Sequence, residues 1–370
     1  MMKQSKTNKM GELRLMKGNE AFAEAAIRAG VDGYFGYPIT PQSEVIEYLM
    51  AEKPHERTGM VVLQAESEVA SINMLYGGGG SGKKVMTSSS SPGISLMQEG
   101  LSYMAGGEVP CVVANVVRGG PGLGDIQPAQ SDYFQSVKGG GHGDYRLPVL
   151  APSSVQEMSD FVPIAYELAF RYRTPVLIIS DGLIGQMMEK VELFDQMPRL
   201  TDEEINELYP WATNGKPKGK KRRVITSLDL DPYKLEKHNF KLQSKYKTIE
   251  AEELRCEIIE CEDADYIIIA YGSSARISQK AIQLAREEGL KVGLLRPITL
   301  WPFPKKPINE LVEKGVKGIL SVEMSAGQMV EDVKLAVRER TKVEHFGRYG
   351  GVIHSPEEVL EALKNQIIGD

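Results

Sequence analysis

The stretch VPCVVANVV, residues 109–117, is the most apolar strand pattern in this sequence. A strand that is apolar on both of its faces is typical of a parallel sheet that helices cover on each side. Similar strand patterns lie before and after it, KKVMTSS (83–89) and TPVLIISD (174–181), and helical patterns separate them, SPGISLMQEGLSYMAG (91–106) and SVQEMSDFVPIAYELAFRY (154–172). This alternation predicts a doubly wound, parallel α/β sheet.

The same rhythm continues toward both ends of the chain. We expect further strands at 32–38, 59–66 and 147–152, and further helices at 18–30, 43–52 and 67–77. A second, shorter series holds the strand patterns DADYIIIAYGSS (263–274), KVGLLRPITLWPFP (291–304) and GILSVEM (318–324). It closes with a helix in HSPEEVLEALKNQI (354–367), where Ser355 caps and Pro356 occupies the first turn.

These two series predict a large α/β domain over residues 11–195 and a smaller one over 256–370, joined by a polar linker over 196–255. The linker carries the basic run GKPKGKKRR (215–223). Such a run is typical of a solvated connection, and capture of a phosphorylated partner is the alternative. Residues 233–260 are expected to form a helix that leads into the second domain.

The composition is that of an ordinary globular chain. The 370 residues are 42% hydrophobic and 25% charged, and the net charge of −6 gives no indication of nucleic-acid binding. Cys111, Cys256 and Cys261 form no CxxC pair, so we expect no zinc site or iron–sulfur cluster held by this chain alone. The polar first residues lack the apolar core of a signal peptide, and no apolar run is long enough to cross a membrane, which predicts a cytoplasmic protein.

The stretch GGGGSGKK (77–84) is close to a phosphate-binding loop, but Lys84 stands where that loop needs Ser or Thr. A true loop follows a strand and opens a helix, whose N-terminus holds the phosphate. The order is reversed here, because a helix expected to end near Tyr76 precedes the glycines and a strand follows them. We therefore disfavour nucleotide hydrolysis and interpret the glycines as a flexible helix-to-strand connection.

Ligands of a parallel α/β sheet gather beyond the carboxyl ends of its strands, and unusual residues occur there. In GYPITPQSEV (36–45), Thr40 is either a helix N-cap or a hydroxyl donor to an anionic substrate group. In QAESEVAS (64–71), Glu68 opens a helix. It either interacts with the helix dipole or lies buried as a proton-sharing carboxyl, and Glu66 competes for that role.

Two further strand ends carry candidate residues. The run SSSSPGISLMQEG (88–100) offers several hydroxyls around a helix N-terminus, which suits an anion, unless the run is simply a flexible loop. Arg118 follows the strand of residues 109–117, where its guanidinium could hold a carboxylate or form a structural ion pair. The glycine-rich KGGGHGDYR (138–146) adds His142 as a weaker candidate for ligand contact.

These segments, with GYPITP and VVRGGPGLGDIQPAQSDYFQ (116–135), resemble in this order the α subunit of 2-oxoacid:ferredoxin oxidoreductases. The stretch GLLRPITLWPFP (293–304) is similar to the transketolase C-terminal-like domain of the same subunits, so the resemblance covers nearly the whole chain. Within the family, GLGDIQPAQSDYFQ and KGGGHGDYR are most similar to the branched-chain (3-methyl-2-oxobutanoate, or 2-oxoisovalerate) type. The 2-oxoglutarate type (2-oxoglutarate synthase) is close.

The resemblance implies a pyrimidine-type thiamine diphosphate-binding domain and the oxidative decarboxylation of a 2-oxoacid. The products would be an acyl-coenzyme A and CO2, with electrons passing to ferredoxin. Glu68 would hydrogen-bond the aminopyrimidine ring nitrogen, and Thr40 and Arg118, with His142, would bind the substrate. Further residues would line the cofactor: Ile39, Ser89, Ser90 and Ser91.

The family's anchor for diphosphate and magnesium, a GDG motif followed by Asn, is missing from this chain. The nearest imitation is SDGLIG (180–185) with Asn206, and we interpret Asp181 as an ordinary strand end. The resemblance therefore implies a β subunit that carries the diphosphate and Mg2+ site, a γ subunit and a ferredoxin-like iron–sulfur subunit, without which this chain is inactive. The alternatives are a non-oxidative thiamine diphosphate enzyme and a non-catalytic α/β protein that kept the scaffold.

Overall fold

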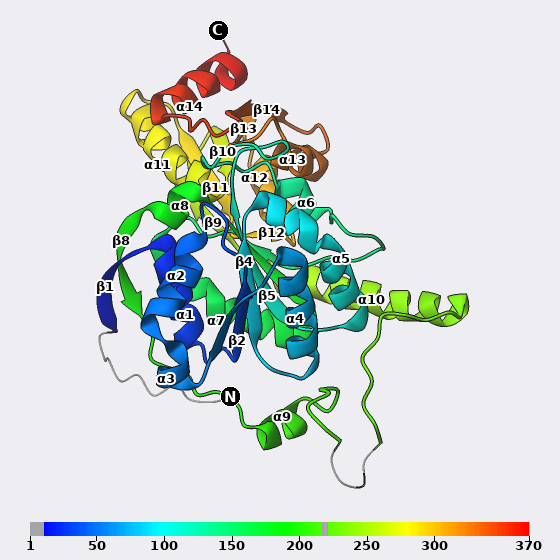
Figure 1. The fold of residues 1–370 in the computed structure, drawn as a ribbon. Helices are drawn as coiled ribbons and strands as arrows, with labels where there is room; N and C mark the ends of the chain where they lie inside the picture. The colour runs from blue at the N-terminus through cyan, green and yellow to red at the C-terminus, as the bar shows by residue number, and fades with distance from the viewer. Residues whose placement is uncertain (1–10, 217–218, 220, 370) are drawn as a thin grey trace.

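The computed structural model describes residues 11–216, 219 and 221–369, and these residues form three sheets (Figure 1). The largest has seven strands in the order β12-β6-β7-β5-β4-β2-β3. Six of its strands are parallel: β2 (Gly33–Gly36), β3 (Val61–Gln64), β4 (Val85–Ser89), β5 (Cys111–Val117), β6 (Val149–Leu150) and β7 (Pro175–Asp181). Strands β4, β5 and β7 are buried along their whole length, which confirms the predicted helix-covered parallel sheet.

Helices cover this sheet on both of its faces. They are α1 (Gly18–Arg28), α2 (Ser43–Glu52), α3 (Pro54–Thr58), α4 (Glu68–Gly80), α5 (Ser91–Gly107), α6 (Tyr133–Val137), α7 (Val155–Tyr172) and α8 (Gly182–Gln186). Helix α1 packs against α7, and α4 packs against α5, so that the two pairs flank the sheet (Figure 1). The predicted linker region contains α9 (Asp202–Leu208) and α10 (Pro232–Glu252).

Serine caps begin several helices where the sequence predicts a start. Ser67 Oγ accepts from the backbone N–H of Ala70 at the start of α4, at 3.2 Å. Ser355 begins α14 (Pro356–Leu363) in the same way, which confirms the predicted cap and the proline in the first turn. Each cap satisfies a backbone donor that the helix itself leaves free.

A five-stranded sheet with the order β14-β13-β10-β11-β9 forms the second unit. Its strands are β9 (Cys256–Ile259), β10 (Tyr266–Ala270), β11 (Val292–Pro297), β13 (Gly318–Glu323) and β14 (Lys342–Gly347). Its helices are α11 (Gly272–Glu287), α12 (Lys305–Glu313), α13 (Met329–Val337), α14 and a π-helical turn, Lys364–Ile368. The prediction of helix up to residue 260 is wrong for β9, an antiparallel edge strand that pairs with β11.

Two strand pairings join distant parts of the chain in ways that the sequence does not indicate. Strand β1 (Glu12–Lys17) pairs antiparallel with β8 (Met188–Leu193) in a separate two-stranded sheet. Strand β12 (Thr299–Trp301) follows β11 of the second unit but pairs antiparallel with β6 in the seven-stranded sheet. A segment of the second unit therefore forms the edge strand of the large sheet.

Buried hydrogen bonds hold the second unit over the carboxyl ends of the parallel strands. Asp181, the last residue of β7, accepts from Ser273 Oγ at 2.7 Å, and it also caps α8. The Gln130 backbone N–H donates to the Met324 carbonyl at 2.8 Å, and its side-chain oxygen accepts from Ser274 Oγ at 2.7 Å. None of the helices in the described ranges is long and apolar enough to cross a membrane.

The glycines of residues 77–80 are helical, so the predicted flexible connection is wrong there. They form the last turn of α4, which runs to Gly80 rather than ending near Tyr76. A Cβ on Gly79 would lie 2.8 Å from Val109 Cγ1 and closer still to the Pro110 carbonyl oxygen, so the end of α4 approaches the start of β5 closely. The same turn exposes Gly77 to open space, with nothing within 4 Å of a Cβ there.

We expect Gly79→Ala to destabilise the chain by about 1–3 kcal/mol, because the added methyl group overpacks the contact with the Val109 side chain and the Pro110 carbonyl. Gly77→Ala is the matched control, and alanine in a helix is favoured over glycine by about 0.5–1 kcal/mol. Thermal unfolding followed by circular dichroism should give a lower midpoint for the first variant and an equal or higher midpoint for the second. The reverse order would contradict the packing described.

Candidate functional site

The predicted site segments follow four neighbouring strands of the large sheet. In the order of the sheet, Arg118 follows β5, Ser89 ends β4, Thr40 follows β2 and Glu68 follows β3. Because these strands are parallel, their carboxyl ends meet at one edge, where ligands of such sheets bind. The fold therefore brings segments spread over about eighty residues of sequence to one edge.

Glu68 and its competitor Glu66 lie in different environments. Ser67 is the N-cap of α4, which makes Glu68 the first helical residue and turns it inward, where only 6% of it is exposed. Glu66 is exposed. The Glu68 carboxylate makes no hydrogen bond to any described residue, although a buried carboxylate is costly unless a partner compensates it. It is therefore free to accept a hydrogen bond from a bound group.

Polar side chains gather beside Glu68 at the start of α5, and the place where Glu68, Ser89 and Gly93 meet is here called the recess. A Cβ on Gly93 would lie 2.7 Å from Glu68 Oε1 and would collide with Ser89 Oγ, so the glycine lets both side chains pack closely against α5. The hydroxyls of Ser89 and Ser90 are completely buried and find no hydrogen-bond partner among the described residues. Buried hydroxyls without a partner are rare in folded proteins, so these two are candidates for contact with a ligand.

The four serines divide into two roles. Ser88 Oγ donates to Gln42 Oε1 at 2.6 Å and lies 2.8 Å from the Tyr34 hydroxyl, whose pKa burial raises to about 12. The Ser91 backbone N–H donates to Asn115 Oδ1 at 3.1 Å. The flexible-loop alternative is wrong for this run, because it forms the end of β4 and the start of α5. Ser88 and Ser91 support the site, whereas Ser89 and Ser90 remain free.

Arg118 is buried and has no ion-pair partner among the residues that the structure describes, so the ion-pair alternative is wrong for it. Nη1 donates to the Thr40 carbonyl at 2.9 Å, and Nη2 donates to the Leu123 carbonyl at 3.0 Å. Nε is buried without a described partner. Two carbonyls thus fix the plane of the guanidinium while its positive charge stays uncompensated, which suits an anionic ligand.

Thr40 meets Arg118 through its backbone carbonyl. Helix α2 begins at Ser43 with Gln42 as its N-cap, so the predicted role of Thr40 as a helix N-cap is wrong. The Ile39 carbonyl accepts from the Gln42 backbone N–H at 3.0 Å, and the turn formed in this way exposes the Thr40 side chain. The turn presents the Thr40 carbonyl to Arg118 and leaves its hydroxyl accessible.

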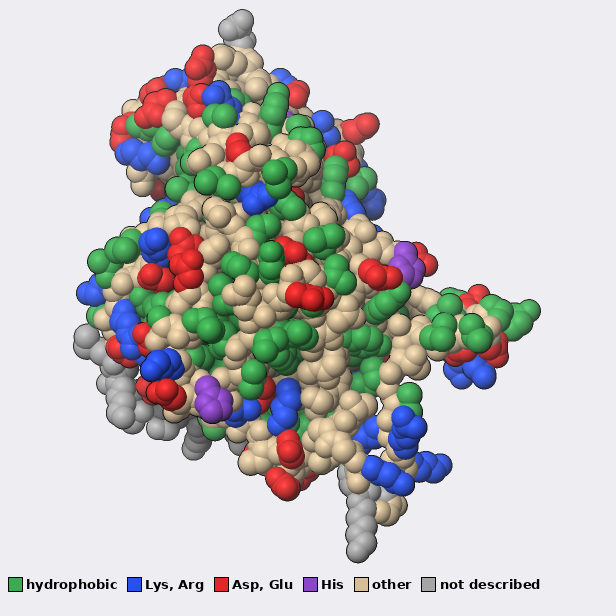
Figure 2. All heavy atoms as spheres, in the orientation of Figure 1, with side chains coloured by type: hydrophobic (Ala, Val, Ile, Leu, Met, Phe, Trp, Pro, Cys, Tyr) green, Lys and Arg blue, Asp and Glu red, His purple; other side chains and the backbone are tan. Residues whose placement is uncertain are grey.

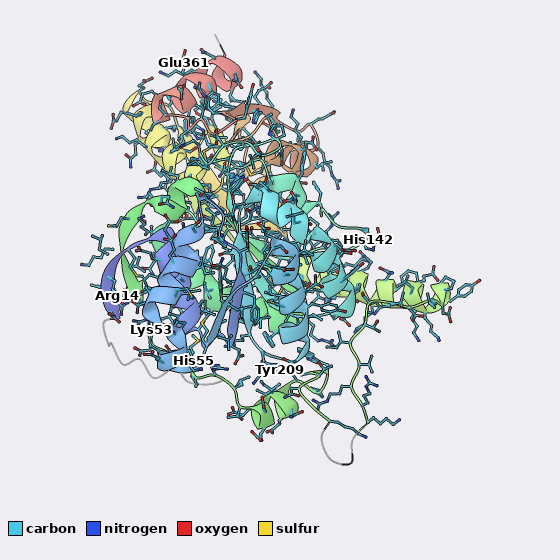
Figure 3. All side chains as sticks on the ribbon, in the orientation of Figure 1. Arg14, Lys53, His55, His142, Tyr209 and Glu361 are labelled. Carbon is cyan, nitrogen blue, oxygen red and sulfur yellow. The ribbon has the colours of Figure 1, made fainter. Side chains whose placement is uncertain are left out.

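His142 lies near helix α10, where it lines a hollow together with Asn239 and Leu242 (Figure 3). Its carbonyl accepts from Ser102 Oγ at 2.6 Å, and its exposed ring meets the Tyr103 ring edge-on at 6.2 Å. Ser102 is eleven residues beyond Ser91 in α5, which corresponds to about 16 Å along a helix. Within the described chain, His142 therefore belongs to the opposite end of α5 from the Ser89 and Glu68 recess.

Sequence reasoning missed two residues behind the recess. Asn115 donates to Asp132 Oδ2 at 2.8 Å while accepting from Ser91, so it links α5 to the segment before α6. Burial raises the pKa of Asp132. The sequence does point to Asn115, because it is the single polar residue in the otherwise apolar strand CVVANVV.

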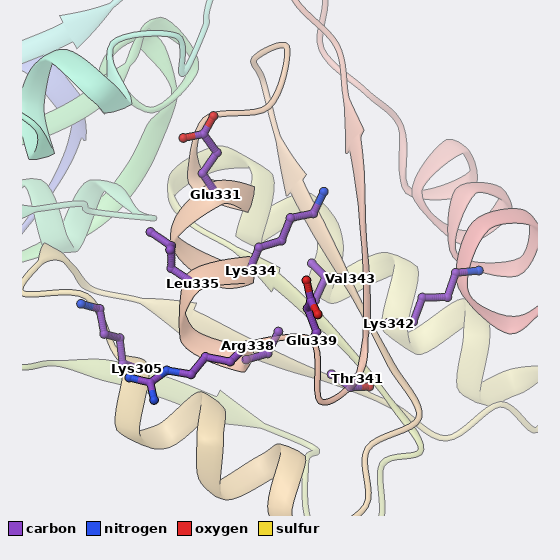
Figure 4. Close-up of a pocket in the computed structure, with 10 residues that line it drawn as sticks. Lys305, Glu331, Lys334, Leu335, Arg338, Glu339, Thr341, Lys342 and Val343 are labelled. Carbon is purple, nitrogen blue, oxygen red and sulfur yellow. The ribbon is translucent and has the colours of Figure 1, made fainter.

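Asp181 and Asn206 do not form a metal site. Asp181 caps α8 at the carboxyl edge, and burial raises its pKa, whereas Asn206 lies on α9 and donates to the Asp202 carbonyl at 2.9 Å. No cluster of three His, Cys, Asp or Glu residues with metal-binding geometry occurs in the described part of the chain. A hollow of about 1260 Å3 between α13 and β14 is lined by basic and acidic side chains such as Lys334, Arg338 and Glu339 (Figure 4), and it contains none of the predicted site residues.

Comparison with known proteins assigns both units to one family. The sequence pattern described as "Pyruvate flavodoxin/ferredoxin oxidoreductase, thiamine diP-bdg" matches residues 24–254, and "Pyruvate:ferredoxin oxidoreductase core domain II" matches residues 264–359. The ketoisovalerate oxidoreductase subunit VorB of Methanothermobacter thermautotrophicus is 48% identical over 360 residues, covering 96% of this chain and 98% of that protein. The 2-oxoglutarate synthase subunit KorA of Methanocaldococcus jannaschii is 35% identical, covering 95% and 99%.

Solved structures agree with this assignment. The 2-oxoglutarate:ferredoxin oxidoreductase from Magnetococcus marinus, solved with 2-oxoglutarate, coenzyme A and succinyl-CoA bound, is 28% identical with a TM-score of 0.80. The match covers 96% of this chain and 65% of that one. A split-gene transketolase shares the fold at 12% identity and a TM-score of 0.58, covering 95% and 98%. The chain therefore belongs to the 2-oxoacid:ferredoxin oxidoreductase family, as an oxidoreductase subunit that carries a thiamine diphosphate-binding domain.

Proposed function

We propose that this chain is the α subunit of an enzyme that oxidatively decarboxylates 3-methyl-2-oxobutanoate to an acyl-coenzyme A and CO2, with electrons passing to ferredoxin. The greater identity to a ketoisovalerate oxidoreductase subunit, 48% against 35% for a 2-oxoglutarate synthase subunit, supports the branched-chain substrate. 2-Oxoglutarate is the second candidate, because a solved relative was captured with it. The observation that carries the proposed chemistry is the buried, unpartnered carboxylate of Glu68 beside the recess at Gly93.

The residues around that recess fit the aminopyrimidine ring of thiamine diphosphate. The Glu68 carboxylate would accept a hydrogen bond from a ring nitrogen and hold a proton there, while Ser89 and Ser90 would offer their free hydroxyls. Ile39 and Ser91 would complete the wall of the pocket. When bound, the cofactor supplies the carbon nucleophile and the electron sink that decarboxylation requires. Glu68 contributes the proton position, and the buried surroundings exclude water.

Arg118 and Thr40 would bind the carboxylate of the 2-oxoacid. The guanidinium is already oriented by two carbonyls, so it can meet an anion without reorganising. The exposed Thr40 hydroxyl could donate to the same carboxylate. Burial around Arg118 strengthens the attraction for an anion relative to that in water.

The remaining parts of the enzyme would come from other subunits. We infer that a β subunit supplies the diphosphate and Mg2+ contacts, because Asp181 and Asn206 lie on different elements and do not converge. Cys111 and Cys261 are buried and Cys256 stands alone, so iron–sulfur clusters would belong to a ferredoxin-like subunit, alongside a γ subunit. The thiamine site would thus be shared across a subunit interface, and the isolated chain would be inactive.

Glu68→Gln should lower the rate of 2-oxoacid- and coenzyme A-dependent viologen reduction by about 100-fold or more in the assembled enzyme, because the amide cannot set the proton position. Glu66→Gln is the matched control on the exposed neighbour and should retain activity. Steady-state rates on the purified complexes measure both. Equal activity of Glu68→Gln and the unchanged enzyme would refute the assigned role.

Arg118→Lys should raise the KM for the 2-oxoacid by about 10-fold or more, because a lysine cannot keep two carbonyl contacts and a carboxylate together. The KM for coenzyme A should change little. Arg276→Lys, in a half-exposed ion pair with Glu189 outside the site, serves as the control. An unchanged KM for the 2-oxoacid would show that the carboxylate binds elsewhere.

Thiamine diphosphate should bind the lone chain about 100-fold more weakly than the assembled enzyme, because the charge-assisted diphosphate contacts would lie on the other subunit. Isothermal titration calorimetry in the presence of Mg2+ compares the two directly. Tight binding by the lone chain would favour the alternative of a self-sufficient, non-oxidative thiamine enzyme.

A further inference from the structure

The turn of residues 37–42, between β2 and α2, carries both Ile39 and Thr40. Gln42 closes this turn in two ways. Its backbone N–H donates to the Ile39 carbonyl at 3.0 Å, and its side-chain Nε2 donates to the Tyr37 carbonyl at 3.1 Å. Gln42 is completely buried, whereas Figure 2 shows charged side chains over α2, the helix that follows it. Gln42 therefore joins the start of the turn to its end from the inside of the protein.

The oxygen of the Gln42 side chain belongs to a relay of completely buried side chains. The Tyr37 carbonyl can only accept, which fixes the orientation of the Gln42 amide and turns Oε1 toward Ser88. Ser88 Oγ donates to Oε1 at 2.6 Å, so the Tyr34 hydroxyl must donate to Ser88, over 2.8 Å. A Cβ on Gly36 would lie 2.5 Å from the Tyr34 hydroxyl, so the glycine in β2 makes room for this relay.

The backbone on the far side of Thr40 is held by other elements. The Thr40 carbonyl accepts from Arg118 Nη1 at 2.9 Å. The Pro41 carbonyl accepts from Asn19 Nδ2 at 2.8 Å and from Gln186 Nε2 at 3.1 Å. Hydrogen bonds therefore fix the backbone before and after the Thr40 side chain, whose hydroxyl stays accessible. Groups that are fixed in this way lose less entropy when they bind a ligand.

We propose that Gln42 is a positioning residue for the 2-oxoacid, which it serves by setting the turn that carries Thr40 and orients Arg118. The inference rests on the proposed function, because it takes Thr40 and Arg118 as the residues that bind the carboxylate. Gln42 acts through the turn, since its own side chain is completely buried. A shift of the turn would move the Thr40 hydroxyl and the Arg118 guanidinium together, and small displacements of binding groups are costly.

Gln42→Glu tests this inference, because it keeps the shape of the side chain and changes one donor. The introduced carboxylate can accept from Ser88, but it can donate to the Tyr37 carbonyl only when it is protonated. Burial raises the pKa of a carboxyl group, so we expect the donor to return as the pH falls from about 8 to about 6. Relative to the unchanged enzyme at each pH, the KM for the 2-oxoacid should be raised about 10-fold or more at the higher pH and should recover at the lower one. The KM for coenzyme A should change little.

Other titratable or charged side chains lie near the turn and are present in both enzymes. Tyr34 ends the relay, Arg118 contacts the Thr40 carbonyl, and Glu44 on α2 accepts from the same Asn19 and Gln186 that hold Pro41. Lys17 in turn pairs with Glu44 at 3.6 Å. Comparing the two enzymes at each pH removes the titration of these groups from the result.

Hydrogen–deuterium exchange on the full-length chain gives a readout that needs no cofactor. The backbone amides of residues 39, 40 and 42, corrected for the intrinsic pH dependence of exchange, should exchange about 10-fold faster in Gln42→Glu at the higher pH. They should match the unchanged chain at the lower pH. If Gln42→Glu does not fold, Ser88→Ala decides the matter, because it breaks the relay without adding a charge. That variant should raise the KM for the 2-oxoacid about 3-fold or more at both pH values.

Gln156→Glu is the matched control, since the half-exposed Gln156 amide on α7 also donates to a backbone carbonyl, that of Glu192, at 3.0 Å. It should leave the KM for the 2-oxoacid unchanged at both pH values. If Gln42→Glu behaves like this control, or if its raised KM does not recover at the lower pH, Gln42 does not position the substrate. Full activity of Glu68→Gln and Arg118→Lys would instead refute the proposed function, so the two failures are distinct.

Discussion

Arg118 and Glu68 are buried ionisable side chains without an ion-pair partner among the described residues, and this sets the constraint on which the proposed site depends. A buried ion is tolerated only where its surroundings compensate it, and an unfilled site leaves that compensation incomplete. The fold holds each group in place. Carbonyls from two loops orient the Arg118 guanidinium, and the serine-capped start of α4 turns the Glu68 carboxylate inward. The seven-stranded sheet matters because it brings both to one edge, with the second unit over it.

Much of this could be predicted from the sequence, and the failures have common physical causes. The buried parallel strands were predictable because their apolar runs admit no other environment, as β5 and β7 show. Strands β1, β8, β9 and β14 were missed because they are short, largely polar or at sheet edges, where tertiary pairing rather than local pattern decides the conformation. The glycines of residues 77–80 were misjudged because packing against residues 109–110 outweighs their weak helix propensity.

The site shows the same division. Residue types and their order bring the predicted site residues to one edge of the sheet, but they do not say which side chains turn inward. Which of Glu66 and Glu68 is buried depends on which residue caps α4, and the Ser67 cap turns Glu68 inward. The contribution of Thr40 to Arg118 is made through a carbonyl, which any residue could supply. His142 illustrates the converse, since a histidine in a glycine-rich loop suggested a ligand contact while the loop packs at the far end of α5.

Strand β12 belongs by sequence to the second unit and by hydrogen bonding to the first sheet. Its partner β6 is two residues long. Without β12, strand β6 would be an exposed edge strand, and its unpaired backbone groups could pair with another polypeptide chain. If the gene were split anywhere between β6 and β12, the pairing of these two strands would become a contact between two polypeptides, held by one short antiparallel pair. The halves of the polypeptide are therefore mutually dependent as folding units, although each has its own sheet.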